Sequence, residues 1–346
     1  MDTQFLLLIA ALFWFSTSAQ IINRINHQLF ENDQCPLTNG ETGICRKTSE
    51  CRSSDRQREL HCEWSKNDPV ICCAESHTDN YDALANRADG VCEGIPEFKS
   101  GGLRDHVVGK AEHAAVGEFP FMALLRYQQE NVRCGAALLN EKFFITAAHC
   151  FKFFDPIAVV TGIDDATDAL ADSYPISRII KHKDYDPRTK QNDIALVEVE
   201  KPVKLNQNVQ PICLYTRSID LPVTTILTIM GWGQDNTDNS SNQLLKGAVR
   251  PVLRSACQTN YTLPKRSVKL SENQLCAQGF ETENGVLTDA CQGDSGGPLV
   301  LEEKSKFHLV GIVSYGAACG TERFPGIYTR ISSYLDWIID IAWKES

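Results

Sequence analysis

Short runs of alternating or continuous apolar residues recur along most of the chain, and Gly, Pro, Asn and Asp turns separate them. The runs are FMALLRY, AALLN, FFITAA, IALVEV, TTILTIMGW, LVGIVSYG and GIYTRI. Such segments between turn residues are typical of strands in a packed sheet. The pattern therefore predicts an all-β barrel or sandwich.

A clear helical period occurs only at the C terminus. Five apolar residues recur there at steps of three and four positions: Ile331, Leu335, Ile338, Ile339 and Ala342. This spacing places them on one face of a helix, and the neighbouring Ser332 and Ser333 resemble a helix cap. We expect a C-terminal helix that packs on the barrel, in preference to a helix that binds a partner or a membrane.

The N terminus predicts export. An apolar run from Phe5 to Phe15 ends in small residues up to Ala19, as in sites that signal peptidase cleaves. We expect a signal peptide over residues 1–19, an N-terminal segment over residues 20–34, and a secreted, extracellular protein. The alternative is a membrane anchor, but this run is shorter than the roughly 20 residues that span a bilayer. No later run is longer, so no membrane partner is expected.

Composition supports the same compartment. The chain has 346 residues with 14 cysteines, and this even number favours an oxidising environment. Its 44 Asp and Glu residues outnumber 34 Lys and Arg residues, which gives a formal charge of −10. Such a chain lacks the positive field that holds phosphate backbones, so nucleic acid is excluded as a partner.

Cysteine spacing divides the chain into two architectures. Six cysteines lie within residues 35–73, and the other eight are spread over residues 92–319. The small segment needs crosslinks to fold, and three disulfides at about 2–4 kcal/mol each would supply the stability. Six cysteines allow 15 pairings, and a zinc site is a less favoured alternative because paired C-x-x-C knuckles are absent from the sequence. Residues 74–91 are polar with almost no hydrophobic periodicity, which predicts a flexible linker.

Three strings carry candidate chemistry: Thr146-Ala147-Ala148-His149-Cys150, Asn192-Asp193-Ile194-Ala195-Leu196 and Cys291-Gln292-Gly293-Asp294-Ser295-Gly296-Gly297-Pro298. A serine hydroxyl is a weak nucleophile near neutral pH unless a neighbouring imidazole removes its proton. The glycines of the third string allow a tight turn that exposes backbone N–H groups beside the hydroxyl. Together, in this order, the strings indicate nucleophilic catalysis.

In these strings the chain resembles the chymotrypsin-like serine proteases, over roughly residues 107–346. The resemblance implies a double six-stranded β-barrel with a C-terminal helix. It implies that Ser295 is the nucleophile, His149 the general base and Asp193 the residue that orients His149. The backbone N–H groups of Gly293 and Ser295 would form the oxyanion hole. Neither a cofactor nor a metal is implied.

The resemblance also implies a substrate preference. Asp289, six residues before Ser295, would form the floor of the specificity pocket and select Arg or Lys, because a buried cation needs a countercharge. Ser314, Gly316 and Gly326 match the pocket walls and leave room for a long side chain. We expect cleavage after Arg or Lys.

Such proteases are made as zymogens, and a cut frees an apolar N terminus whose ammonium would pair with Asp294. Val107-Val108-Gly109 resembles the family's start, so the expected scissile bond is His106–Val107. The alternative, Arg104–Asp105, suits a trypsin-like activator but leaves a charged terminus two residues too long. His106 replaces the usual Arg or Lys, which favours activation by an upstream protease over self-activation.

The six-cysteine module, with its adjacent Cys72 and Cys73, resembles the clip domain of arthropod serine proteases. The implied organisation is a disulfide-knotted clip domain over residues 35–73, a linker and activation segment over residues 74–106, and a protease domain over residues 107–346. The pairs implied by the two resemblances are Cys35–Cys72, Cys45–Cys62, Cys51–Cys73, Cys92–Cys213, Cys134–Cys150, Cys257–Cys276 and Cys291–Cys319. A clip domain implies docking of a partner or cofactor, with a simple spacer as the alternative.

The implied setting is haemolymph, in a cascade that leads to prophenoloxidase activation and melanisation, Toll-ligand processing or clotting. The expected partners are other zymogens or proforms as substrates, an upstream activating protease and a serpin inhibitor. Two alternatives remain: a non-catalytic binding or cofactor protein on the same scaffold, and a broad digestive protease.

Two further features bear on the surface. Asn239 and Asn260 begin N-x-[ST] sequons in polar stretches and are expected glycosylation sites. The acidic loop with Asp164, Asp165, Asp168 and Asp172 suggests a solvated turn, with calcium binding as the less favoured alternative because Ile163 stands where calcium-binding relatives place a Glu.

Overall fold

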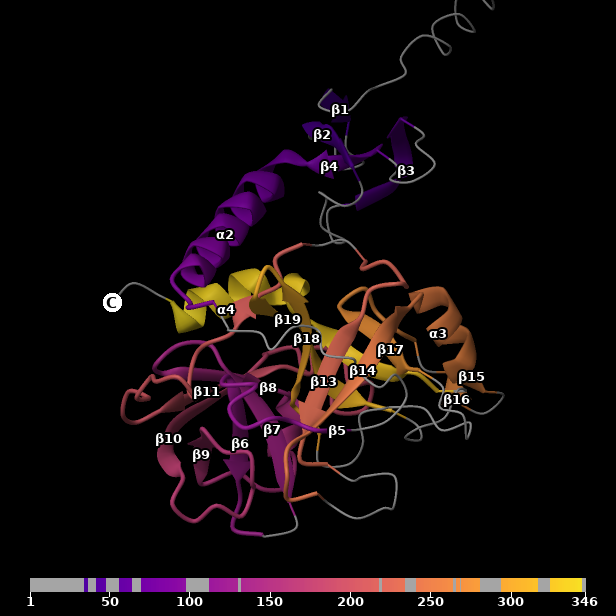
Figure 1. The fold of residues 1–346 in the computed structure, drawn as a ribbon. Helices are drawn as coiled ribbons and strands as arrows, with labels where there is room; N and C mark the ends of the chain where they lie inside the picture. Colours follow the sequence, from indigo (N-terminus) through magenta and orange to yellow (C-terminus); the bar gives the residue numbers. More distant parts are fainter. Residues whose placement is uncertain are drawn as a thin grey trace, which may run out of the picture. The chain divides into compact units, whose positions relative to one another are not determined.

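Antiparallel strands make up most of the regular secondary structure in this computed structural model (Figure 1). It describes residues 34–36, 42–47, 56–63, 70–97, 112–129, 132–217, 220–233, 241–263, 266–267, 269–280, 294–316 and 324–343. The chain divides into two units, Met1–Tyr81 and Asp82–Ser346.

The first unit is a four-stranded antiparallel sheet. Its strands, in spatial order, are β1 (Gln34–Pro36), β2 (Thr42–Lys47), β4 (Val70–Ala74) and β3 (Arg56–Glu63). A disulfide joins Cys35 to Cys72, which is a pair that the clip resemblance implies. Cys45 and Cys73 are buried and disulfide-bonded as well. Disulfide-bonded cysteines therefore make up much of the buried part of this small unit.

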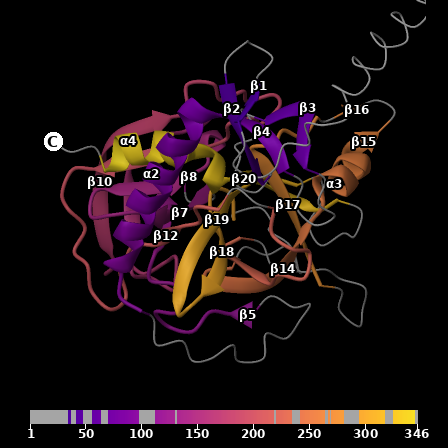
Figure 2. The same ribbon diagram turned by 90° about the horizontal axis from the view of Figure 1, so that it is seen from above.

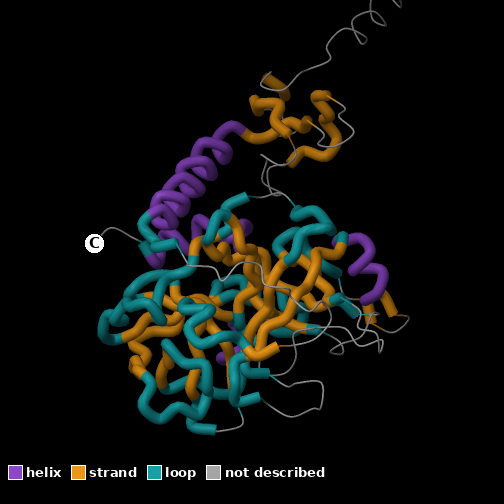
Figure 3. The backbone as a smooth tube through the Cα atoms, viewed as in Figure 1, coloured by secondary structure: helices purple, strands orange, loops and turns teal. Residues whose placement is uncertain are grey.

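Strands fill the body of the second unit, with little helix (Figure 3). The first barrel closes in the order β10 (Asp172–Lys181), β11 (Ala195–Val199), β8 (Phe143–Thr146), β7 (Arg133–Leu138), β6 (Met122–Arg126) and β9 (Ala158–Thr161). Side chains of β6, β8 and β11 are almost entirely buried. These strands therefore form a packed core.

The second barrel has six strands: β13 (Leu227–Gly231), β14 (Leu245–Val252), β17 (Gln274–Gly279), β18 (Pro298–Glu303), β19 (Lys306–Tyr315) and β20 (Gly326–Arg330). Pairing of β19 with both β18 and β20 closes the ring. β5 (Glu112–His113) adds to β14, β12 (Cys213–Leu214) pairs with β19, and β15 (Thr262–Leu263) and β16 (Arg266–Ser267) form a separate hairpin. The predicted double six-stranded barrel is confirmed, and each predicted apolar run contains a strand.

The predicted C-terminal helix is also confirmed. A 3₁₀ turn, η3 (Ile331–Tyr334), leads into α4 (Leu335–Ala342). The expected apolar face packs inward, with Leu335, Ile338 and Ile339 at most 1% exposed.

The prediction of a flexible linker after the cysteine-rich module is wrong. The structure forms a helix, α2 (Glu75–Glu93), over this stretch. Leu84, Ala88 and Cys92 are buried at four-residue steps. A disulfide joins Cys92 to Cys213, and the Arg87 guanidinium donates to the carbonyl of Trp343, the residue after α4. The ribbons of α2 and α4 are both labelled in Figure 2. These contacts lie within the second unit, to which residues from Asp82 onwards belong, and they stabilise a helix that its own sparse apolar pattern does not predict.

A second helix was not expected either. α3 (Arg254–Tyr261) buries only Cys257 and Tyr261, which is too short a pattern to stand out in the sequence. The Cys257–Cys276 disulfide holds it to β17. Among the described residues, no helix combines the length and the apolar character needed to cross a membrane.

Candidate functional site

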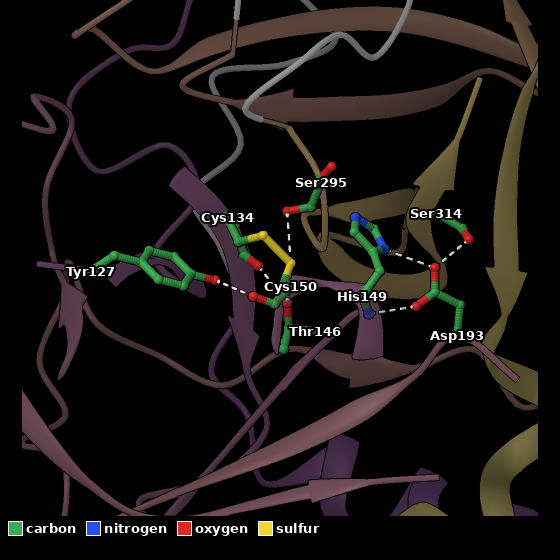
Figure 4. The surroundings of a disulfide bond; sticks show 9 residues. Tyr127, Cys134, Thr146, His149, Cys150, Asp193, Ser295 and Ser314 are labelled. Atoms are coloured by element: carbon green, nitrogen blue, oxygen red, sulfur yellow. Dashed lines mark hydrogen bonds and ion pairs between the residues drawn. A yellow bond between two sulfur atoms is a disulfide. The ribbon is translucent and has the colours of Figure 1, made fainter. Parts of the chain in front are cut away.

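Strand register brings His149 to Asp193. Ala195 of β11 lies opposite Thr146 of β8, so the residues before β11 face the residues after β8. His149 lies there in a 3₁₀ turn, η2 (Ala148–Phe151). The backbone N–H of His149 donates to Asp193 Oδ1 at 2.8 Å, and His149 Nδ1 lies 2.7 Å from Asp193 Oδ2 (Figure 4). Two bonds to one carboxylate fix the position of the imidazole.

Asp193 is held as a carboxylate although its side chain is fully buried. Burial alone would raise its pKa, but the hydrogen bond and charge of His149, the charge of Lys190 and a hydrogen bond from Ser314 outweigh burial and lower that pKa. The Ser314 hydroxyl donates to Asp193 Oδ2 at 2.6 Å. An ionised Asp193 accepts the proton of His149 Nδ1, which leaves Nε2 with a lone pair on the opposite side of the ring.

The turn before Asp193 is also fixed. Lys190 and Asn192 have positive φ angles of 57° and 55°, a region that side chains rarely occupy. The Asn192 amide donates to the carbonyl of Asp184 at 2.8 Å, and its Oδ1 accepts from the Tyr334 hydroxyl at 2.8 Å. One hydrogen bond within the turn and one to a residue 142 positions away therefore hold the unusual backbone that presents Asp193.

Ser295 lies on a loop packed against the elements that carry His149. Its carbonyl oxygen accepts from the Gly135 N–H of β7 at 2.8 Å and lies 3.8 Å from Cys150 Sγ, one residue after His149 (Figure 4). The Cys134–Cys150 disulfide links β7 to η2 at this point. The next residue, Gly296, has φ +76°, and its N–H donates to the carbonyl of Val313 at 3.0 Å. The loop, the disulfide and η2 thus bring Ser295 and His149 into one site.

The other predicted residues are placed unevenly. Asp294 Oδ1 accepts from the Gly233 N–H at 2.9 Å. Gly316 is exposed at the end of β19, and Gly326 is buried at the start of β20. Outside the described residues lie the predicted signal peptide and these predicted site residues: His106, Val107, Asn239, Asp289, Cys291, Gly293 and Cys319; the side chains of Cys51 and Cys62 also lie outside them. Asn260 lies partly buried near the end of α3.

Carboxylates of the acidic loop bind their own backbone. Asp165 Oδ1 accepts from the N–H and hydroxyl of Thr167, and Asp165 Oδ2 accepts from the Gln243 amide. Asp168 Oδ1 accepts from the Leu170 N–H at 2.8 Å. These bonds correspond to the structural turn that the sequence favours.

Sequence analysis missed part of the support around Asp193. Ser314 is predicted only as a residue of the substrate pocket wall, and the structure adds that its hydroxyl donates to Asp193. The Thr329 hydroxyl donates to the Asp193 carbonyl at 2.8 Å. Neither contact leaves a local signal, because 121 and 136 residues separate the partners along the chain.

Replacing Ser314 with Ala is expected to lower the free energy of unfolding by about 1–2 kcal/mol near neutral pH, because a buried carboxylate loses a donor. The folded-state pKa of Asp193 is lowered, so its ionisation stabilises the fold above the unfolded pKa and this contribution is lost as pH falls through the folded pKa. The difference from the unmodified chain should therefore shrink as pH falls through the lowered pKa of Asp193. Urea unfolding of Ser314→Ala and of the unmodified chain across this pH range measures this difference in the free energy of unfolding.

Thr329→Val is the matched control. It removes a hydrogen bond to a carbonyl, which does not titrate, so its cost should not follow the ionisation of Asp193. Equal pH dependence of the two variants would contradict the role given to Ser314.

Comparison with known proteins gives consistent matches. Residues 108–338 match the protein family described as Trypsin. The chain is 31% identical to Phenoloxidase-activating factor 3 of Holotrichia diomphalia, over 88% of this chain and 93% of that protein. It is 30% identical to CLIP domain-containing serine protease C9 of Anopheles gambiae, over 94% and 89%. It is 32% identical to Melanization protease 1 of Drosophila melanogaster, over 78% and 76%.

Proposed function

The chain belongs to the trypsin family of serine proteases, in its clip-domain group, and on this premise we propose that it is a secreted zymogen whose activated form cleaves proteins after Arg or Lys. The observation that carries the proposal is the double hydrogen bond between His149 and a buried, ionised Asp193, beside the loop of Ser295. A non-catalytic protein on this scaffold would have no need to maintain a buried carboxylate with three donors.

The geometry supports the following mechanism. Asp193 holds the proton on Nδ1 of His149, so Nε2 accepts the proton of the Ser295 hydroxyl as its oxygen attacks the scissile carbonyl. The charge of Asp193 stabilises the imidazolium that forms. His149 then returns the proton to the leaving amine, and a water molecule repeats the cycle to release the acyl group. Backbone N–H groups of Ser295 and Gly293 would stabilise the oxyanion.

Specificity in this proposal comes from Asp289, whose carboxylate would pair with the cation of an Arg or Lys side chain. An added Cβ at Gly316 would meet no atom of the described residues within 4 Å, which supports open space beside this predicted pocket wall. A long side chain therefore has room to pass.

Activation is proposed to occur at His106–Val107, with Arg104–Asp105 as the alternative. The new ammonium would pair with Asp294, next to Ser295, and order the site. The Cys92–Cys213 disulfide would keep the clip-containing segment attached to the protease body after the cut. The names of the relatives, Phenoloxidase-activating factor 3 and Melanization protease 1, support a place in a melanisation cascade. Zymogens as substrates and a serpin as inhibitor are part of this proposal.

The activated chain, with its new N terminus determined by sequencing, is expected to hydrolyse arginyl and lysyl peptide amides at least about 100-fold faster, in kcat/KM, than matched phenylalanyl or glutamyl amides, because the pocket must neutralise a cation. A chromogenic assay measures the rates. Full-length chain with Ser295→Ala, treated in the same way, is the control. If the unmodified chain and the control are equally inert, the chain is a binding protein; indiscriminate cleavage of unfolded proteins would instead indicate a digestive protease.

A further inference from the structure

Two lysines lie within three residues of the His149–Asp193 pair along the chain, although the chain is acidic overall. Lys152 directly follows η2, and its backbone N–H donates to the carbonyl of His149 at 3.1 Å. Lys190 lies three residues before Asp193, in the turn with positive φ angles. The whole chain carries a formal charge of −10, so any attraction of an anion to these two lysines has to come from their local contacts.

The backbone of Lys190 is fixed, which limits where its amine can go. Its N–H donates to the carbonyl of Asp186 at 2.8 Å, and its carbonyl accepts from the Gln274 amide at 3.3 Å. Lys190 is partly buried in this position. Burial lowers the pKa of the Lys190 amine, the charge of Asp193 raises it and the charge of Lys152 lowers it, with a net lowering. Lys190 therefore interacts with both the His149–Asp193 pair and Lys152.

Neither amine has a countercharge in the part of the chain that the structure describes, where no carboxylate lies within 4.0 Å of Lys152 or Lys190. Asp193 is near Lys190, but its two oxygens already accept from His149 and Ser314. A partly desolvated cation that lacks a partner gains most from an anion brought to it.

Two exposed aromatic residues, Phe153 and Phe154, directly follow Lys152 along the chain. Phe153 is 78% exposed and Phe154 is 45% exposed, which is unusual for large apolar side chains. The Lys152 amine lies 4.8 Å from the centre of the Phe153 ring. The Phe153 and Phe154 rings can cover the aliphatic part of a bound side chain while the Lys152 and Lys190 amines face its charge.

We propose that Lys190 and Lys152 form a subsite that binds an acidic side chain of the substrate, within two residues of the cleaved Arg or Lys. This inference rests on the proposed function and specifies the substrate class: sites in which a cation enters the specificity pocket and an anion lies beside His149. Because the net charge of the chain repels acidic peptides at long range, such a preference must come from local contacts.

The test uses the activated full chain and a set of fluorogenic peptides with Arg at the cleaved position. Each of the two positions on either side carries Glu, Gln or Lys in turn. We expect the Glu peptide to exceed the Gln peptide by about five-fold in kcat/KM at one position at least. Salt at 1 M should reduce this ratio, because the Debye screening length falls from about 10 Å at 0.1 M salt to about 3 Å. Ratios within one variant cancel any effect of the substitution on the chemical step.

Charge reversal then identifies the residues. Lys190→Glu should reverse the preference so that Lys exceeds Gln, and Lys190→Gln should remove it. Lys152→Glu, at an exposed position, should weaken it even if the Lys190 variants fold poorly. Lys201→Glu, an exposed lysine on the loop after β11, changes the net charge equally and should keep the preference.

Equal cleavage of Glu and Gln peptides at all four positions would overturn this inference and leave the proposed function intact. A preference that survives Lys190→Glu and Lys152→Glu would also overturn it. If the unmodified activated chain cleaves none of the arginyl peptides, the proposed function itself fails, and the subsite fails with it.

Discussion

Replacing Asp193 with Asn is expected to lower kcat of the activated chain about 10⁴-fold on an arginyl peptide amide, with the fold intact. An Asn side chain can still accept from the His149 N–H through its oxygen. Its amide, however, would donate towards His149 Nδ1, where the carboxylate now accepts. The imidazole would then carry its proton on Nε2 and could not accept the proton of the Ser295 hydroxyl.

The measurement is kcat and KM for Asp193→Asn, with far-ultraviolet circular dichroism and urea unfolding as checks of the fold. Ser295→Ala should lose at least as much activity, and the double variant should lose little more than Ser295→Ala alone, because residues that act as one unit are not additive. An Asp193→Asn variant that keeps a tenth of the activity, or a fully additive double variant, would contradict the assignment of the triad.

Most of the fold could be predicted from the sequence because strand signals are local. Runs such as FFITAA and IALVEV carry enough buried apolar residues to identify β8 and β11. Their pairing then brings the ends that carry His149 and Asp193 together. The residues of the site were thus predictable from motifs, and the reason that they meet is a strand register.

The helix α2 shows where local reasoning fails. Its buried apolar residues Leu84, Ala88 and Cys92 form a single narrow stripe, and Gly90 lies within the helix. Glycine in a helix costs about 1 kcal/mol relative to alanine, so the segment is a weak helix by itself. The Cys92–Cys213 disulfide and a hydrogen bond from the Thr216 hydroxyl to Asp89 support it. Such partners more than 100 residues away leave no trace in a local pattern.

The hydrogen bonds that support Asp193 could not be predicted from the sequence for a related reason. Ser314 lies in an apolar run whose strand was predicted, but the direction of its hydroxyl depends on how the second barrel meets the first. The positive φ angles at Lys190 and Asn192 are equally non-local, because hydrogen bonds from Gln274 and Tyr334 hold them. Motifs therefore locate the reacting groups, and tertiary packing determines their electrostatics.

Gly296→Ala is expected to lower the free energy of unfolding of the second unit by about 2–6 kcal/mol, because two penalties of about 1–3 kcal/mol each combine there. The residue has φ +76°, which strains any side chain. An added Cβ would also lie 2.2 Å from Thr146 Oγ1 and 2.7 Å from the Gly135 carbonyl oxygen. The Gly135 contact is with backbone and cannot be relieved by turning a side chain, so the Ser295 loop must move away from β7 and β8.

Gly316→Ala is the matched control, since it adds the same methyl group at another glycine of the site. Its Cβ would meet no atom within 4 Å, so its stability should stay within about 0.5 kcal/mol of the unmodified chain. Thermal unfolding should separate the two variants by about 4–24 °C, since each kcal/mol shifts the melting temperature of a unit of this size by about 2–4 °C. Equal melting temperatures would mean that the Ser295 loop is not packed against Thr146 and Gly135, and the link that brings Ser295 to His149 would then be lost.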